Sequence, residues 1–94
     1  MKSRSSQLLK ILIEAGEFTA DDMASELAAT RADIDAFVLG DLPMPLPQQL
    51  CLALLVIAKS PKYQRRGHTL RAQVAAAIAF HAHETATHAR PPIS

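Results

Sequence analysis

Apolar residues recur every three or four positions along most of this chain, and glycine and proline interrupt the pattern. This spacing is typical of helices that bury one face, and no stretch alternates apolar and polar residues as a half-buried strand would. The first stretch predicts a helix that begins after Ser5 or Ser6 and ends at Gly16. Its apolar face comprises Leu8, Leu9, Leu12 and Ile13.

Two similar helix starts follow. Thr19 precedes Asp22 by three residues, which is the spacing of a capping box at a helix N-terminus. Thr30 and Asp33 repeat this spacing, and Gly40 predicts the end of the third helix. The residues expected to face the core are Met23, Leu27, Ile34, Phe37 and Val38.

A proline-rich connection leads to the most apolar part of the chain. Residues 41–47 contain three prolines, and Pro47 suits the first turn of a fourth helix. Residues 50–58 are all apolar, a run that would also fit a buried strand. Their Leu and Ala content and the proline start favour a helix that is buried nearly all round. Cys51 lies in this run and is therefore expected to be a buried structural thiol.

The last helix is rich in alanine. Residues 60–68 are mostly polar and are expected to form a loop, with Gly67 at a helix boundary. Thr69 is expected to cap the fifth helix, which Pro91 and Pro92 end. Its apolar stripe comprises Leu70, Val74, Ala77, Ile78 and His81, with Phe80 beside it.

Together these elements predict an all-α fold, a compact bundle of about five helices. The chain has 94 residues, enough for one modest core, so we expect a single helical domain over residues 1–90 and a short disordered tail over residues 91–94. The longest apolar run is well short of the ~20 residues that span a bilayer. Glu14 and Glu17 interrupt the apolar N-terminal stretch, so no signal peptide is expected. A cytoplasmic location follows from these expectations.

The charges are divided unevenly between the two halves of the chain. Residues 1–47 carry four bases and eight acids, whereas residues 48–94 carry six bases and one acid. Such a division indicates partners rather than fold. The candidate acidic interaction face comprises Asp21, Asp22, Glu26, Asp33 and Asp35. The candidate basic segment, for protein contact or phosphate binding, comprises Lys59, Lys62, Arg65, Arg66 and Arg71, and a solvated polar loop explains it equally well.

Residues 18–58 contain four features in order. They are an apolar residue followed by Ala, a helix with an N-cap, a Gly-x-x-Pro ending and a further apolar helix. The residues in this pattern are Met23, Ala24, Thr30, Ile34, Phe37, Gly40, Pro43, Leu50, Leu54 and Leu55. In this order and spacing the segment resembles the helix-turn-helix of the phage-repressor and Cro-like family. The resemblance implies a helix-turn-helix-like centre whose second helix would read DNA, and it implies a regulator of transcription.

The positions that would contact DNA differ from that family. Ala20 stands where a Gln is common, and Val38 stands where a Glu is common. The outward positions of the third helix are Arg31, Ala32, Asp33, Asp35 and Ala36. Arg31 is the candidate base contact, because a guanidinium can bind guanine through two hydrogen bonds. Residues 17–41, however, contain seven acids and one base, and carboxylates repel a polyanion.

The leading hypothesis is therefore a non-enzymatic regulatory binding module that acts through protein contacts, including self-association as a dimer. Excess apolar surface at Leu52, Val56 or Phe80 would support that contact. The alternative is a DNA-binding transcriptional regulator that uses the helix-turn-helix and the basic segment. Weak binding to duplex DNA would fit that alternative.

A histidine-rich stretch near the C-terminus is a weak metal candidate. His81, Glu84 and His88 are spaced so that one helix face could present all three to zinc. A polar helix end explains them more simply. A Gly-rich phosphate loop, a nucleophile elbow and paired catalytic carboxylates are missing from the sequence, so neither an enzyme nor a cofactor is expected.

Overall fold

The computed structural model describes the backbone of residues 3–89 and the side chains of residues 3–80. The described backbone is mostly helical and contains no β-strand, so the predicted all-α bundle is confirmed. The predicted tail, residues 91–94, lies outside the described residues. The elements in chain order are α1 (Arg4–Glu14), α2 (Ala20–Glu26), α3 (Arg31–Leu39), α4 (Leu46–Lys59), the short 3-10 helix η1 (Pro61–Tyr63) and α5 (Gln64–Ala89).

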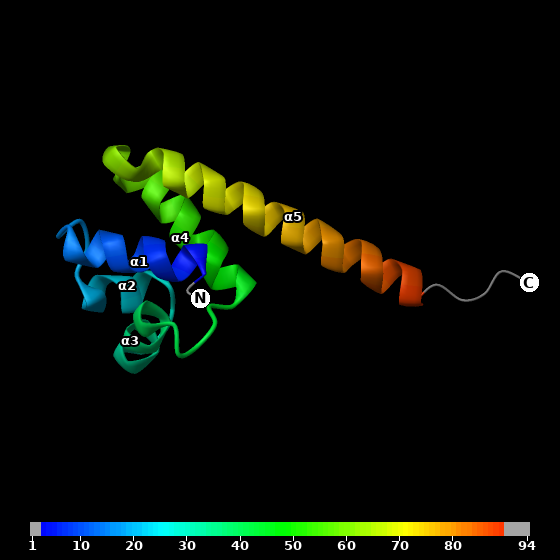
Figure 1. Ribbon diagram of the computed structural model, residues 1–94, viewed down its shortest axis with the longest axis horizontal. Coiled ribbons are helices and arrows are strands. Elements are labelled where there is room, and N and C mark those ends of the chain that lie inside the picture. Colours follow the sequence, from blue (N-terminus) through cyan, green and yellow to red (C-terminus); the bar gives the residue numbers. More distant parts are fainter. Residues whose placement is uncertain (1–2, 90–94) are drawn as a thin grey trace, which may run out of the picture.

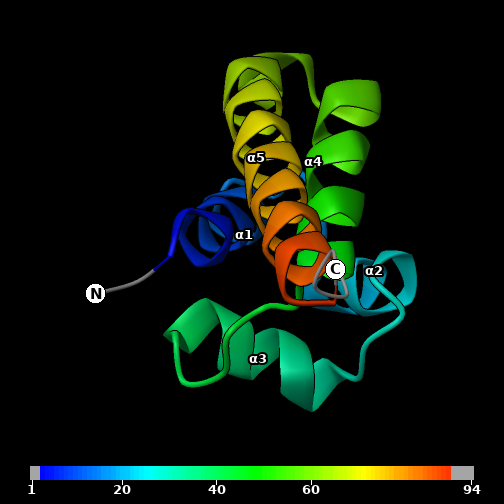
Figure 2. The ribbon, with the colours of Figure 1, turned by 90° about the vertical axis from the view of Figure 1, so that its right-hand side faces the viewer.

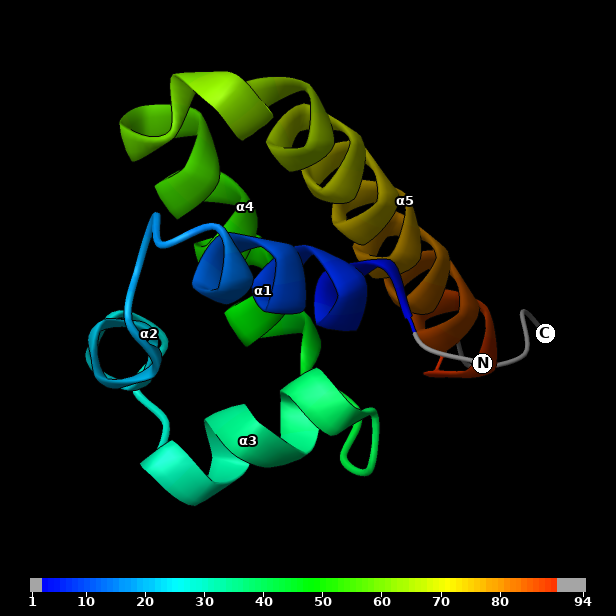
Figure 3. The ribbon, with the colours of Figure 1, turned by 60° about the vertical axis from the view of Figure 1, so that its left-hand side comes forward.

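The most extensive packing between two helices joins α4 and α5, which form a helical hairpin (Figure 1). α1 crosses beside this hairpin, and α2 and α3 lie below it (Figures 1 and 3). Figures 1, 2 and 3 share one vertical axis, and in all of them α3 is at the bottom and the α4–α5 connection is at the top. The helix with the acidic residues and the junction with the basic residues therefore lie at opposite ends of the helical body.

One hydrophobic core joins all five α-helices. The buried apolar residues are Leu8, Leu9, Leu12, Met23, Leu27, Ile34, Phe37, Met44, Leu52, Ala53, Leu55, Val56, Leu70 and Val74. They recur at helical spacing, as the sequence pattern predicted for the first three helices. Each large side chain that is fully buried contributes about 1.5–3 kcal/mol relative to its exposed state.

The two predicted capping boxes are present. Thr19 Oγ1 accepts a hydrogen bond from the backbone NH of Asp22 (3.0 Å), and Asp22 Oδ2 accepts one from the NH of Thr19 (3.2 Å). The same reciprocal pair joins Thr30 and Asp33 at the start of α3 (3.0 and 3.3 Å). Gly40 ends α3 with a φ of 81°, a left-handed conformation that glycine adopts without steric cost. The starts of α2 and α3 are thus determined locally.

The start of α1 differs from the prediction by a few residues. Ser3 is the N-cap, and its Oγ accepts a hydrogen bond from the NH of Ser6 (3.2 Å). Ser5 and Ser6 lie inside the helix and are buried. The Ser6 hydroxyl donates to the carbonyl oxygen of Phe37 near the end of α3. This buried hydrogen bond joins two helices that are 31 residues apart in sequence, a contact that no local pattern indicates.

The prediction of a loop over residues 60–68 is wrong. Pro61 begins η1, and α5 starts at Gln64, whose Nε2 donates to the carbonyl of Ile57 near the end of α4 (3.0 Å). Thr69 is not a cap but lies within α5, where its hydroxyl donates to the carbonyl of Arg65 (2.9 Å). Gly67 is buried inside the helix rather than at its boundary. Gln64, Arg65, Arg66 and His68 of this stretch are exposed on α5, and polar residues of this kind suit a loop equally well by composition.

The prediction that α4 is buried nearly all round is also wrong. Leu52 and Val56 are fully buried, so they are not the excess surface that the sequence suggested. Cys51 is exposed, and the expected buried thiol is not present. Leu54 exposes 46% of its surface, although the resemblance placed it on the inner face. The neighbouring helices cover only part of α4, and Cys51, Leu54 and Ala58 form an apolar outer stripe at helical spacing.

α5 extends beyond the body of the bundle (Figure 1). It has 26 residues against 14 in α4, so it is longer by about 18 Å at 1.5 Å per residue. Leu70 and Val74 are buried, whereas Ile78 and Phe80 expose 44% and 66% of their surface. The predicted apolar stripe therefore leaves the core after Val74. We call residues 78–89 the arm. Within the described part of the chain, no helix is both long and apolar enough to span a membrane.

Candidate interaction surfaces

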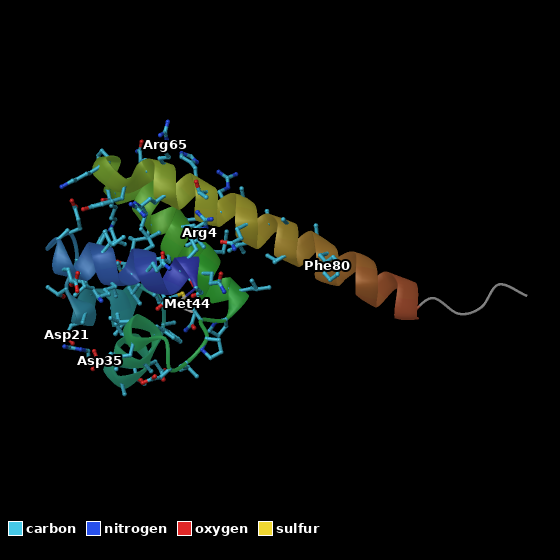
Figure 4. The ribbon with its side chains drawn as sticks, viewed as in Figure 1. Arg4, Asp21, Asp35, Met44, Arg65 and Phe80 are labelled. Carbon is cyan, nitrogen blue, oxygen red and sulfur yellow. The ribbon has the colours of Figure 1, made fainter. Side chains whose placement is uncertain are left out.

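The acidic surface of α2 and α3 is organised around one arginine. Arg31 Nη1 lies 3.1 Å from Asp21 Oδ1, and Arg31 Nε lies 3.3 Å from Asp35 Oδ1. Figure 4 shows both carboxylates at the lower end of the molecule. The hydrogen bond that Arg31 donates to Asp21, followed by the one that it donates to Asp35, raises the pKa of the Arg31 guanidinium above its usual value. The charge of Arg31 is compensated by two carboxylates from its own chain.

The other members of the predicted acidic face have different surroundings. Asp22 and Asp33 are the partners of the two capping boxes, so both carboxylates have a structural role at a helix N-terminus. Glu26 is exposed near the end of α2. Asp33 is half-buried, and the other four acids are exposed. The structure therefore places all five predicted acids on the α2–α3 end, where the carboxylates outnumber Arg31.

The predicted basic segment is divided among several surfaces of the α4–α5 junction. Lys59 is exposed at the end of α4, and the ammonium of Lys62 lies 5.5 Å from the centre of the Tyr63 ring, a cation–π distance. Arg71 lines a shallow hollow of about 210 Å³ with His68, Ala72 and Ala75. None of these three cations lines the groove to which Arg65 and Arg66 belong.

Arg65 and Arg66 line a groove between α1 and α5 with a volume of about 510 Å³. Arg4 comes from α1 and is the third arginine of the lining. Figure 4 labels Arg4 between α1 and α5, and Arg65 at the top of the molecule near the start of α5. The remaining lining residues are Gln7, Leu8, Thr69 and Gln73. We call this feature the arginine groove. Sequence reasoning missed Arg4, because only the tertiary contact between α1 and α5 brings the first turn of the chain to residue 65.

Exposed apolar side chains form a further group of candidate contacts. Leu54 of α4 and Ile78 and Phe80 of α5 belong to the hairpin. Leu39 and Leu42 are exposed near the end of α3. Large exposed apolar side chains are informative when several lie close in the fold, because such patches mark contact sites.

The weak metal candidate cannot be placed, since the side chains of His81, Glu84 and His88 lie outside the described residues. Among the residues whose side chains are described, no group of three or more His, Cys, Asp or Glu side chains is arranged to hold a metal ion.

Fold and surfaces together define an all-α helical protein with an acidic end, an arginine groove and an exposed apolar arm. Comparison of the chain with protein-family models, curated proteins and solved structures found no match.

Proposed function

We propose that this chain is a non-enzymatic regulatory binding module that acts through protein contacts, and that its first partner is a second copy of itself. The observation that carries the proposal is the arm, where α5 continues past the core and exposes Ile78 and Phe80. In proteins most of the stability of a helix comes from the packing of its apolar face. Burial of its apolar residues against a partner would stabilise it.

A second copy offers a suitable surface for the arm. Cys51, Leu54 and Ala58 form the outer stripe of α4, which other helices of the same chain leave uncovered. If each arm packs on the α4 stripe of the other copy, the same contact forms twice. A symmetric dimer of this kind is closed and does not extend into chains. It also doubles the buried area, which a short arm needs to approach the ~1,200 Å² of a stable interface.

Charge gives this encounter an orientation. The carboxylates lie on the α2–α3 end and the cations at the α4–α5 junction, at opposite ends of the body. Complementary fields speed and orient association more than they strengthen it. The apolar contact supplies the affinity in this proposal, and high salt is expected to weaken the dimer only modestly.

The alternative, a DNA-binding regulator with a helix-turn-helix-like centre related to phage repressors, rests on the spacing of structural residues. The ion pairs of Arg31 weigh against it, because the candidate base contact already holds Asp21 and Asp35. Contact with a guanine would require at least part of this arrangement to break. The α4–α5 junction also lies at the opposite end of the body from α3, so the cations at this junction do not flank the helix that would read DNA, and we rank this function second.

The mass of the full chain in solution tests the dimer. Light scattering after size exclusion, at tens of micromolar protein, should give twice the chain mass. Phe80→Ser and Leu54→Ser should each give a folded monomer, because each removes apolar area from one side of the same contact. Leu39→Ser is the matched control: Leu39 is 62% exposed but lies on α3, so this variant should stay dimeric.

Two results would contradict the proposal. Wild-type protein that is monomeric at millimolar concentration has no such interface. A dimer that Leu39→Ser breaks and Phe80→Ser leaves intact uses the α3 end instead of the arm.

A further inference from the structure

We propose that the arginine groove between α1 and α5 binds a small molecule that carries two or more phosphate groups. This inference does not depend on self-association, because the groove is lined by residues of one chain. It rests on three arginines that line one hollow whose lining contains no Asp or Glu.

The composition of the lining is the first argument. Arg4, Arg65 and Arg66 line one hollow, and none of its other lining residues is an Asp or Glu. In the part of the chain that the structure describes, no ion pair joins these three arginines to an acid. Arg31 shows the contrast, since the same chain gives that side chain two carboxylates. Three like charges without a counter-charge repel one another, and an anion in the groove would relieve that repulsion.

The chemistry of the donors is the second argument. Each guanidinium has five N–H donors in a planar fork, which matches two oxygens of one phosphate group. Charge-assisted hydrogen bonds of this kind are the strong ones in proteins. Arg65 and Arg66 are adjacent on α5, while Arg4 comes from α1, so the groups approach the hollow from two elements. Two phosphate groups can therefore be held at once, whereas a single phosphate cannot use all three forks equally well.

The size and shape of the groove favour a small ligand over a nucleic acid. Its volume of about 510 Å³ falls in the range of ~300–1,000 Å³ that is usual for small-molecule sites. A duplex needs an extended strip of cations along its backbone. Here Arg71 lines a different hollow, and Lys62 lies over Tyr63. These two cations do not line the groove.

The lining also limits what is recognised. No aromatic side chain lines the groove, so a nucleobase would have no stacking partner there. Gln73 and the oxygen of Thr69 can contact a polar group next to the phosphates. Recognition is therefore directed at the phosphates, and inorganic pyrophosphate and a nucleoside diphosphate share that chemistry.

Isothermal titration calorimetry of the full chain with inorganic pyrophosphate tests this inference. We expect saturable binding with one site per chain. Arg4→Gln and Arg66→Gln should each weaken it by about tenfold or more, the usual loss for a hydrogen bond to a charged group. Arg71→Gln is the matched control, with the same charge change on the same helix outside the groove, and should change the affinity less than about twofold. All three arginines are exposed, so the variants should keep the wild-type circular dichroism.

Two further titrations identify the source of the phosphates. Adenosine diphosphate should bind about as well as pyrophosphate if the groove contacts phosphates alone; much tighter binding would assign the ligand to nucleotides within the same proposal. Phe80→Ser protein should bind pyrophosphate as wild type does, so that a failure of the dimer and a failure of the groove give different results.

Three outcomes would overturn the inference. One is the absence of pyrophosphate binding at millimolar concentration. Another is an equal loss in Arg71→Gln and Arg66→Gln, which would indicate a diffuse positive field. The third is duplex DNA binding that depends on Arg4 while pyrophosphate does not bind.

Discussion

Gly67 of α5 lies directly against Ile57 of α4, so closely that a Cβ on Gly67 would be 3.0 Å from Cγ1 of Ile57. The same Cβ would be 3.1 Å from the backbone oxygen of Ala53 and 3.1 Å from Cγ1 of Val56. A side chain can move, but the helical carbonyl of Ala53 cannot move without disturbing α4. This contact sets the close approach of the two longest helices.

Gly67→Ala is therefore expected to destabilise the protein. At an exposed helical position the change would stabilise by about 1 kcal/mol through helix propensity. Overpacking against α4 costs about 1–3 kcal/mol and should outweigh that gain. Gly67→Val should cost more, because its branched side chain meets the same carbonyl. Urea unfolding measures both, and a more stable Gly67→Ala protein would show that the helices can separate freely at this point.

Ser6→Ala should lower the free energy of unfolding by about 1–2 kcal/mol, because the buried hydroxyl that donates to the Phe37 carbonyl is lost. Ser25→Ala provides the control, since Ser25 is exposed on α2 and its change should stay within about 0.5 kcal/mol. Chemical denaturation measures the free energy of unfolding of both variants. An equal decrease in the two would mean that the Ser6 hydroxyl does not join α1 to α3.

Ala28 lies in the turn between α2 and α3 with a φ of 52°, which is unfavourable for a residue with a Cβ. Ala28→Gly should stabilise the protein by about 0.5–1 kcal/mol, since the relief of strain exceeds the added entropy of the unfolded glycine. Ala32→Gly, at an exposed position of α3, should instead destabilise by about 1 kcal/mol. Thermal unfolding gives the melting temperature of each variant. A change in the same direction for both would contradict a left-handed conformation at Ala28.

Cys51 should react with a thiol reagent in the native protein, at dilute concentration and without denaturant, because its side chain is exposed on α4. In a chain with Cys51→Ala and Ala53→Cys, the thiol would replace a fully buried residue and should react only on unfolding. Absorbance of the released reagent measures both rates. Slow labelling of a monomeric native protein would place the outer stripe of α4 inside the core.

Arg31→Ala should leave the affinity for duplex DNA unchanged, at the non-specific level of ~10⁻⁴–10⁻⁶ M. Exchange of both Asp21 and Asp35 for Asn would release Arg31 and should strengthen DNA binding if α3 approaches DNA at all. Fluorescence anisotropy with random and selected duplexes measures these affinities. Tight, sequence-selective binding that Arg31→Ala abolishes would restore the DNA-binding function to first rank.

The features that the sequence predicted well are local. Thr19 and Thr30 cap their helices with carboxylates three residues away, and Gly40 ends α3, because each arrangement needs only one turn of chain. The all-α class follows from the same short-range spacing. The predicted start of the fifth helix at Thr69 is wrong, because charged and polar residues fit an exposed helix face as well as a loop.

Which residues are exposed and which are paired at the surface depends on contacts between helices that are distant in sequence. The apolar run of residues 50–58 does not reveal which side of α4 meets a neighbouring helix. The sequence therefore predicts Leu52 at the surface and Cys51 in the core, the reverse of the structure. Arg31 was placed correctly on the exterior of α3, but its pairing with Asp21 required the packing of α2 on α3.

What the sequence determined by itself was therefore where most helices begin and end, because caps, prolines and helical periodicity act within a few residues. Only the tertiary structure decided that Arg4 and Arg65 line one groove and that α5 extends beyond the core, which leaves Phe80 exposed. Helix packing brings together residues some sixty positions apart, and which faces meet depends on the summed burial of every helix rather than on any single segment.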